Sequence, residues 1–149
     1  MAQSYDPVAR LNELISGIDY AILTTVRPDG SLHSCPMAAH RVEADGVIWF
    51  LSNIQTEKVE AIKTSQRVNL AFVDHAAQRY ISVSGYCELV RSRSKATELW
   101  NDNYKSWCPA GADDPSLILL KVDVQQAEYW SATECRMVEL VGFNQPAIE

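Results

Sequence analysis

The 149 residues are enough for one domain with a buried core, which we expect to span residues 1–149, and 47% hydrophobic with 21% charged residues is an ordinary globular composition. The formal net charge of −6 argues against a general nucleic-acid-binding protein, because affinity for phosphate backbones requires clustered Lys and Arg. No apolar run reaches the ~18 residues of a membrane span, and the first residues lack the apolar segment of a signal peptide. We therefore expect a cytoplasmic protein with no membrane or nucleic-acid partner.

Cysteines and histidines show neither a disulfide nor a metal pattern. The four cysteines lie far apart without a Cys-x-x-Cys pair, and the three histidines lack metal-ligand spacing. We therefore expect no metal and a reducing compartment. A nucleophilic cysteine would need a neighbour that lowers its pKa. His33 is two positions from Cys35, but that spacing in a strand assures no contact, and buried packing is the favoured interpretation of the cysteines.

The first predicted element is an amphipathic helix. Asp6 is suited to cap a helix and Pro7 to occupy its first turn. Apolar residues then recur at helical spacing, and Gly17 marks the expected end; the apolar residues are Val8, Leu11, Leu14, Ile15 and Ile18.

Strands are predicted from Ala21 onward. Residues 21–26 and 31–39 flank the turn sequence at 27–30 and predict a hairpin. Pro36 should occupy a sheet edge or a bulge, because proline cannot donate a hydrogen bond to a neighbouring strand. The turn sequence Asp45-Gly46 predicts closure of the next strand pair, with a third strand over 47–51.

A second helix is predicted to begin near Thr56, and a further strand pair is predicted over 68–73 and 79–90. Gly85 in the middle of the second of these strands indicates a bend or a close approach of another backbone.

The last third of the chain predicts a helix and two closing strands. The helix is capped by Ser92 or Ser94, extends through several aromatic residues and ends at 108–111. The strands are predicted over 117–130 and 136–143. Six or seven antiparallel strands with short flanking helices indicate an α+β, mainly β fold in the form of a small barrel.

The corner that follows the third strand is the strongest candidate site. Ser52 and Thr56 offer hydroxyl groups and Lys58 an ammonium group, beside a helix start whose N–H groups have no intrahelical partner. Such a corner suits a phosphate group, although a capped helix with a solvated lysine is the plainer interpretation. The aromatic residues of the second half are typical of a core or a dimer interface, or one of them covers the planar ring of a ligand.

The order of these elements resembles the flavin-binding split-barrel superfamily, whose best-known members are the pyridoxamine 5′-phosphate oxidases. The segments that support the resemblance are 46–72, 79–85 and 128–130. Residues 99–107 and 111–122 resemble the general stress protein branch. The resemblance extends from about residue 14 to residue 130. It implies an antiparallel split β-barrel that pairs into a homodimer, with one flavin mononucleotide (FMN) at each end of the subunit interface.

The resemblance also implies roles for particular residues. Ser52, Thr56 and Lys58 would hold the FMN phosphate, with Leu51 and Asn53 beside it. The segment 35–37 would lie along the flavin ring, and two tryptophans would approach the ring; these five residues are Cys35, Pro36, Met37, Trp107 and Trp130, with Trp107 coming from the partner subunit.

Two departures from the family pattern affect the expected chemistry. Cys35 and Glu57 replace arginines, which predicts weak FMN binding because each charge-assisted hydrogen bond contributes roughly 1.5–3 kcal/mol. The segment 132–137 replaces an arginine-leucine-histidine motif that binds substrate, so pyridoxamine phosphate oxidation is not expected.

The resemblance implies an FMN-dependent oxidoreductase that accepts electrons from a transiently bound NAD(P)H or a small-molecule substrate, although no catalytic residue can be named. In such proteins the flavin performs the redox chemistry. The alternatives are a non-catalytic flavin-binding or stress-associated module and, as a further possibility, a heme-binding split barrel.

Overall fold

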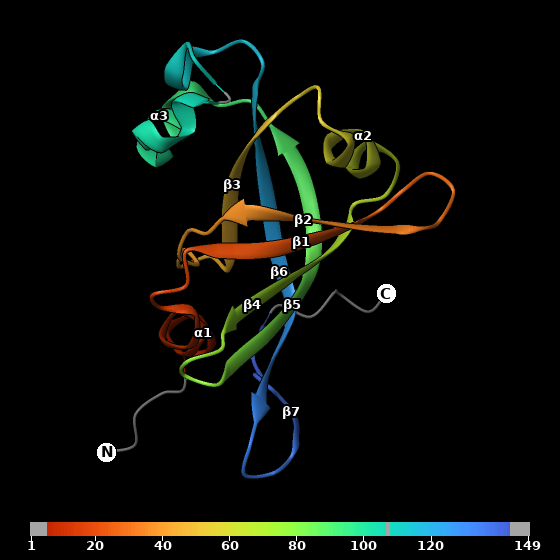
Figure 1. Ribbon diagram of the computed structural model, residues 1–149, viewed down its shortest axis with the longest axis vertical. Coiled ribbons are helices and arrows are strands. Elements are labelled where there is room, and N and C mark those ends of the chain that lie inside the picture. The colour runs from red at the N-terminus through yellow and green to blue at the C-terminus, as the bar shows by residue number, and fades with distance from the viewer. Residues whose placement is uncertain (1–5, 107, 144–149) are drawn as a thin grey trace.

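The computed structural model describes residues 6–106 and 108–143, which form three α-helices, two 3₁₀-helices and seven β-strands (Figure 1). The helices are α1 (Pro7–Ile15), α2 (Glu57–Thr64) and α3 (Arg93–Leu99), and the 3₁₀-helices are η1 (Asp102–Ser106) and η2 (Gly111–Asp113). The strands are β1 (Tyr20–Val26), β2 (Leu32–Ala38), β3 (Val47–Asn53), β4 (Arg67–Asp74), β5 (Arg79–Val90), β6 (Leu117–Ser131) and β7 (Arg136–Glu139).

All seven strands belong to one antiparallel sheet. The strand order is β2-β1-β4-β5-β6-β3, and β7 pairs with the far end of β6. Figure 1 shows β1 and β2 running across the long strands β5 and β6, so that the sheet curls around a core. The two end strands, β2 and β3, approach each other without forming a ladder between described residues. The predicted mainly β split barrel is therefore confirmed.

Local sequence signals account for the first elements. The Asp6 carboxylate accepts hydrogen bonds from the backbone N–H groups of Val8 and Ala9 at 3.1 and 3.4 Å, which caps α1. Gly30 has a φ of +89°, which its lack of a Cβ permits, and it closes the β1–β2 hairpin. Pro36 lies on the end strand β2, as predicted.

The predicted role of Asp45-Gly46 is wrong, because this turn does not close a pair between β2 and β3. β3 pairs with β6 instead, with Phe50 opposite Leu120. The preceding segment, 39–46, is held against α1, where the Asn12 side chain donates to the carbonyl of Val42 at 2.9 Å and accepts from its N–H at 2.8 Å. Because these tertiary contacts redirect the chain, the turn signal alone could not identify the partner strand.

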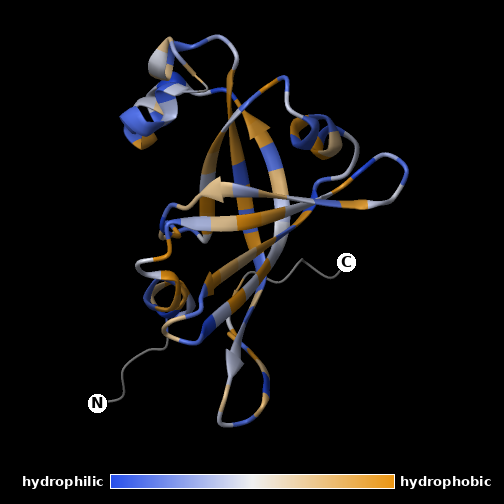
Figure 2. Ribbon diagram, in the orientation of Figure 1, coloured by the Kyte–Doolittle hydropathy of each residue, from blue (hydrophilic) through white to orange (hydrophobic). Residues whose placement is uncertain are grey.

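Two apolar clusters hold the fold together. The larger one fills the barrel and includes Leu11, Phe50, Leu70 and Phe72, all fully buried. The second lies between β3, β6 and the segment from α3 to η2; its buried members are Leu51, Ala96, Tyr104, Cys108, Leu117 and Leu119. Hydrophobic colouring is concentrated along the strands in Figure 2, whereas α3 is largely hydrophilic. Among the described residues, no helix is long and apolar enough to cross a membrane.

The predicted third helix is too long. Ser92 does cap α3, accepting from the N–H of Lys95 at 3.2 Å, but the helix ends at Leu99. The Asn101 side chain then accepts from the N–H of Asn103 at 2.9 Å, a local bond that competes with helix continuation and precedes η1. The last predicted strand is also too long, since β7 ends at Glu139.

Gly85 lies where the β5–β6 register shifts, and a Cβ at this position would lie 2.1 Å from the carbonyl oxygen of Asp123. The predicted close backbone approach is confirmed.

We expect Gly85→Ala to lower the free energy of unfolding by about 1–3 kcal/mol, because the added methyl group must displace the backbone of β6. Denaturant unfolding measures the change. Glu88→Ala, at an exposed position on the same strand, is the control and should change stability by no more than about 0.5 kcal/mol. Equal stabilities of the two variants would contradict the close approach.

Candidate functional site

A cleft of about 800 Å³ lies where the barrel is open between β2 and β3. Such a volume is in the usual range for sites that bind small molecules and cofactors. The residues that line the cleft come from the end of β2 and the chain after it, the end of β3, the start of α2, the start of β1, and η1 with the chain before it; they are Asp19, Tyr20, Pro36, Met37, Ala38, Ala39, His40, Leu51, Ser52, Asn53, Thr56, Lys58, Asn101, Asn103, Tyr104 and Ser106.

The corner between β3 and α2 offers several hydrogen-bond donors to the cleft. Ser52 is 3% exposed, and its hydroxyl lies 3.4 Å from that of Thr56. Thr56 occupies the position before α2, but its hydroxyl donates to the carbonyl of Asn53 at 2.8 Å and accepts nothing from the helix. The first turn of α2 therefore lacks a side-chain cap, which leaves its N–H groups suited to an anion.

Lys58 is the cation of this corner. Among the described residues, its side chain forms no ion pair and no hydrogen bond, whereas Lys63 of the same helix pairs with Glu60 at 2.9 Å. An ammonium group without a carboxylate partner, beside an uncapped helix start, favours a negatively charged ligand.

Glu57 lies next to Lys58 but its charge is already balanced. Arg27, from the β1–β2 turn, donates to the Glu57 carboxylate, and this hydrogen bond is the main reason that the pKa of Glu57 is lowered. The structure thus places a guanidinium group near the corner from a turn far away in the sequence. Sequence reasoning missed this pair, because neither residue shows a pattern that points to the other.

Cys35 lies close enough to Lys58 for the two to interact electrostatically. Burial raises the pKa of the Cys35 thiol, and the Lys58 ammonium offsets only part of this change, so the thiol stays protonated at neutral pH. A protonated thiol is a poor nucleophile. Its neighbours Pro36 and Met37 line the cleft, as expected for the edge of β2.

The opposite wall of the cleft contains a hydrogen-bonded pair. His40 Nε2 lies 3.0 Å from the hydroxyl of Tyr104. Burial lowers the pKa of His40, although Glu43 opposes the change, and burial raises the pKa of Tyr104. Both side chains are therefore uncharged at neutral pH. Sequence reasoning missed the pair because His40 resembles an ordinary surface histidine and Tyr104 an ordinary core residue.

Seven of the ten predicted site residues line the cleft: Pro36, Met37, Leu51, Ser52, Asn53, Thr56 and Lys58. Cys35 lies next to them. Trp130 does not line the cleft of its own chain; it lies near the end of β6, opposite Met137 of β7. Trp107 lies outside the described residues.

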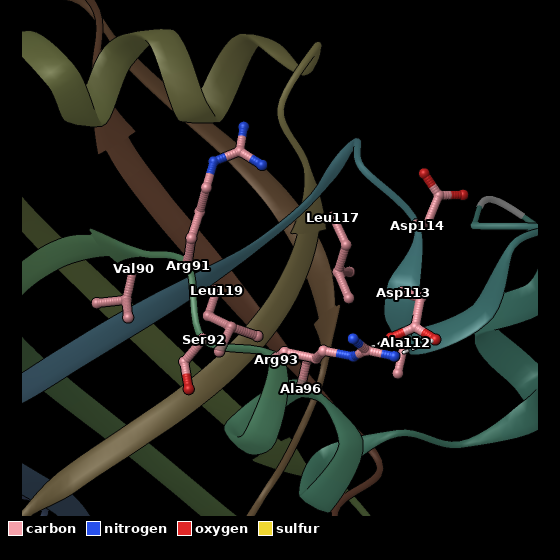
Figure 3. Close-up of a pocket in the computed structure, with 10 residues that line it drawn as sticks. All are labelled: Val90, Arg91, Ser92, Arg93, Ala96, Ala112, Asp113, Asp114, Leu117 and Leu119. Atoms are coloured by element: carbon pink, nitrogen blue, oxygen red, sulfur yellow. Dashed lines mark hydrogen bonds and ion pairs between the residues drawn. The ribbon is translucent and has the colours of Figure 1, made fainter.

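A second, smaller pocket of about 360 Å³ lies between α3, η2 and the neighbouring ends of β5 and β6 (Figure 3). An ion pair between Arg93 and Asp113 spans its rim at 2.6 Å, and the Arg91 side chain extends away from this pair. Asp114 accepts from the N–H and hydroxyl of Ser116 at 2.9 and 2.6 Å. The charged groups of this smaller pocket therefore bond largely to other groups of the chain. None of the predicted site residues lines this pocket.

No group of three or more metal-ligating side chains occurs within 6–106 and 108–143. The four cysteines are free thiols.

Comparison with known proteins identifies relatives of the whole fold. A family model described as "Pyridoxamine 5'-phosphate oxidase like" matches residues 6–149. Protein bli-3 of Neurospora crassa is 24% identical over 134 residues, which make up 83% of this chain and 64% of that protein. The chain thus spans less than two thirds of the length of this relative.

Two solved structures are similar along nearly their whole length. General stress protein 26 from Bacillus anthracis str. Sterne is 23% identical with a TM-score of 0.74, and the match covers 89% of this chain and 98% of that one. A general stress FMN/FAD binding protein from Xanthomonas citri is 24% identical with a TM-score of 0.69, covering 91% and 93%. At these identities the likeness establishes the shared split-barrel fold.

Other proteins with this fold bear different names. An F420 reductase is 22% identical with a TM-score of 0.61, covering 85% of this chain and 98% of that one. A heme binding protein from Mycobacterium smegmatis is 12% identical with a TM-score of 0.69, covering 93% and 59%. The fold therefore does not select the ligand, and the side chains of the cleft must do so.

The buried histidine of the cleft makes stability dependent on pH. Because folding lowers the pKa of His40 below its ordinary value of 6.5, the unfolded chain binds a proton more readily than the folded chain does. The contribution of neutral His40 to the free energy of unfolding is therefore fully present above pH 6.5. It is lost as the pH falls through the pKa that His40 has in the folded chain. We expect His40→Gln to show a smaller decrease in Tm than the unmodified chain across this range. His75→Gln, at an exposed turn, is the control and should show the same decrease in Tm as the unmodified chain. The same decrease in His40→Gln would contradict an effect of burial on His40.

Proposed function

This chain belongs to the pyridoxamine 5′-phosphate oxidase-like family, and from this membership we propose that it binds FMN non-covalently in the cleft between β2 and β3. The observation that carries the proposal is the corner at the start of α2. There an unpaired Lys58, a buried Ser52 hydroxyl and an uncapped helix start adjoin one end of a cleft of about 800 Å³. These groups are the donor set that a phosphate monoester requires.

Each residue of the corner has a distinct part in this proposal. Lys58 supplies the full positive charge, and the Ser52 hydroxyl and the first N–H groups of α2 donate hydrogen bonds to phosphate oxygens. The Thr56 hydroxyl, which donates to the carbonyl of Asn53, would donate to the phosphate after turning away from that carbonyl. Leu51 and Asn53 flank the phosphate. The edge of β2 at Cys35, Pro36 and Met37 lies along the ring, where small and apolar side chains permit close contact with a planar group.

The affinity for FMN should be modest. Cys35 contributes no charge, and Glu57 engages the guanidinium of Arg27 at the position where the pyridoxamine phosphate oxidases have an arginine. Among the described residues that line the cleft, Lys58 is then the one cation. A ligand phosphate would therefore lose its hydration and gain fewer charge-assisted hydrogen bonds than two arginines would give.

A second copy of the chain would complete the site. Apolar residues form a row across the outer face of the sheet: Tyr20 lies opposite Ala38, and Val73 opposite Tyr80. The β1–β4 ladder pairs Ala21 with Phe72 and the β5–β6 ladder pairs Ile81 with Tyr129, so one position beyond these pairs Tyr20 comes next to Val73, and Tyr80 next to Trp130. Tyr20, Val73 and Trp130 are 63%, 52% and 36% exposed, which supports burial against a partner.

The same row explains how Trp130 could approach a flavin. Ala38 borders the cleft, whereas Trp130 lies near the far end of β6, beside β7, and does not line the cleft. In a two-fold dimer each residue of an interface meets the partner's surface in reversed order. Pairing through this face would carry Trp130 of one copy toward the cleft of the other.

Bound FMN would supply two-electron redox chemistry, and the chain would orient it and set its electrostatic surroundings. We propose an oxidoreductase that receives electrons from NAD(P)H and passes them to a small acceptor. A protein that only binds or stores FMN is the alternative. Stopped-flow mixing of the FMN-loaded protein with NADH and with NADPH separates the two. If neither donor reduces the bound FMN faster than it reduces free FMN, the proposed oxidoreductase activity is excluded.

Heme is the second ligand to consider, because a heme binding protein shares the fold. His40 is the histidine that lines the cleft, and its Nε2 already faces Tyr104 at 3.0 Å. An axial ligand would need that nitrogen or a reoriented ring. The absorption spectrum of freshly purified protein distinguishes a flavin from a heme Soret band.

The phosphate assignment predicts the effect of removing the cation. Lys58→Ala should weaken FMN at least tenfold, since a charge-assisted bond contributes roughly 1.5–3 kcal/mol, and should leave riboflavin affinity unchanged because riboflavin lacks the phosphate. Flavin fluorescence titration measures both affinities. Lys63→Ala, which removes a paired lysine from the same helix, is the matched control. Equal loss for both ligands would contradict a phosphate contact.

The position of Trp130 predicts complementation between subunits. In this test, Lys58→Ala chains are mixed and reassociated with Trp130→Ala chains. If Trp130 acts in the partner's site, each mixed dimer has one site with both residues intact and one site with both residues replaced. We expect half the normal number of tight FMN sites in such dimers, each with the normal quenching of flavin fluorescence. No intact site in the mixed dimers, or no dimer at all by light scattering, would refute the arrangement.

A further inference from the structure

The wall of the cleft opposite Lys58 differs in chemistry from the phosphate corner. Its side chains are polar but mostly uncharged: Asn101, Asn103, Ser106 and the His40–Tyr104 pair. Asp19 also lines the cleft, and its carboxyl group disfavours a second anion. Since the pKa of His40 is lowered by burial, no positive charge faces a ligand from this wall at neutral pH.

Tyr104 is held in a fixed orientation. Its side chain belongs to the apolar cluster beneath α3 and is 8% exposed. Its ring meets that of Trp100 edge to face, with centroids 5.6 Å apart. Its N–H donates to the carbonyl of Asn101 at 2.9 Å, and its carbonyl accepts from the N–H of Cys108 at 2.9 Å. The hydroxyl can therefore be presented to the cleft without loss of much rotational freedom on binding.

His40 is fixed by a different segment of the chain. It lies in the segment that follows β2, between Ala39, whose N–H donates to the carbonyl of Asp19 at 2.8 Å, and Val42, which exchanges two hydrogen bonds with Asn12. Two separately anchored segments thus bring the imidazole and the phenol within 3.0 Å. A neutral imidazole carries one N–H, so the pair can donate or accept according to the tautomer.

We propose that His40 and Tyr104 form a neutral hydrogen-bonding pair that binds an uncharged, planar carbonyl group in the cleft. This proposal rests on the proposed flavin function. It adds the kind of chemical group that binds at the end of the cleft away from the phosphate. The carbonyl group has two possible sources: the flavin ring itself, or a second substrate such as a quinone. Preorganised neutral donors favour such a group over a carboxylate, whose desolvation they could not offset.

Tyr104→Phe tests the proposal, because it removes the hydroxyl and keeps the packed ring. Loss of one neutral hydrogen bond corresponds to about a three- to tenfold loss of affinity. If the flavin ring is the source, FMN and riboflavin should weaken by the same factor in fluorescence titrations. If a second substrate is the source, both flavins should bind normally, and menadione, an uncharged quinone, should weaken by that factor in calorimetric titration of the FMN-loaded protein. Either result supports the proposal.

The chain provides a matched control in a second His–Tyr pair. His75 Nδ1 lies 2.6 Å from the hydroxyl of Tyr80 at the exposed β4–β5 turn, and neither residue lines the cleft. His75→Phe, which breaks this pair from the histidine side and lies outside the proposed dimer face, should leave all three affinities unchanged. His40→Phe removes the pair from its other side and should reproduce the loss seen with Tyr104→Phe, which guards against misfolding of one variant.

Unchanged binding of FMN, riboflavin and menadione in both Tyr104→Phe and His40→Phe would overturn the proposal. An equal loss in His75→Phe would do the same, because it would show a general effect. Failure of the unmodified chain to bind either flavin would instead remove the proposed function, and menadione titration of the flavin-free protein would still decide whether the pair binds a carbonyl group.

Discussion

The open seam between β2 and β3 is the constraint on which the rest of the structure depends. Pro36 has no N–H to donate, and the Asn12–Val42 hydrogen bonds draw the chain after β2 toward α1. β3 then satisfies its backbone on β6. The two end strands of the sheet face each other across a cleft instead of a ladder, so the edge positions that a closed barrel would bury are available to a ligand.

The elements that the sequence predicts well are those whose causes are local. Asp6-Pro7 fixes the start of α1, Asp29-Gly30 the first hairpin, and Gly85 the close approach of β6, since a cap, a turn and a missing Cβ act within a few residues. The partner of β3 is decided by tertiary packing, so the Asp45-Gly46 turn was consistent with either pairing. The end of α3 was missed because helical spacing of apolar residues continues where Asn101 bonds locally to Asn103.

The same distinction holds for the candidate site. The corner from Ser52 to Lys58 is contiguous in the chain, so a pattern of hydroxyls and one lysine could indicate it. His40 and Tyr104 are 64 positions apart, and Arg27 and Glu57 are 30 apart. Such pairs leave no periodic signal in one sequence, and only the path of the folded chain reveals them. Trp130 illustrates the converse: a family resemblance suggests a role in the site, but the residue does not line the cleft of its own chain.

The distribution of charge along the cleft bears on how one fold can serve different ligands. Arg27 neutralises Glu57 outside the cleft lining, which leaves Lys58 without a competing carboxylate beside it. At the other end, burial keeps His40 uncharged against Tyr104. A ligand that matches both ends has one anionic group and a neutral, hydrogen-bonding ring. A flavin with a terminal phosphate has this form, whereas heme presents two carboxylates and requires an axial ligand. In this chain the positive charge thus lies at one end of the cleft and the neutral hydrogen-bonding pair at the other.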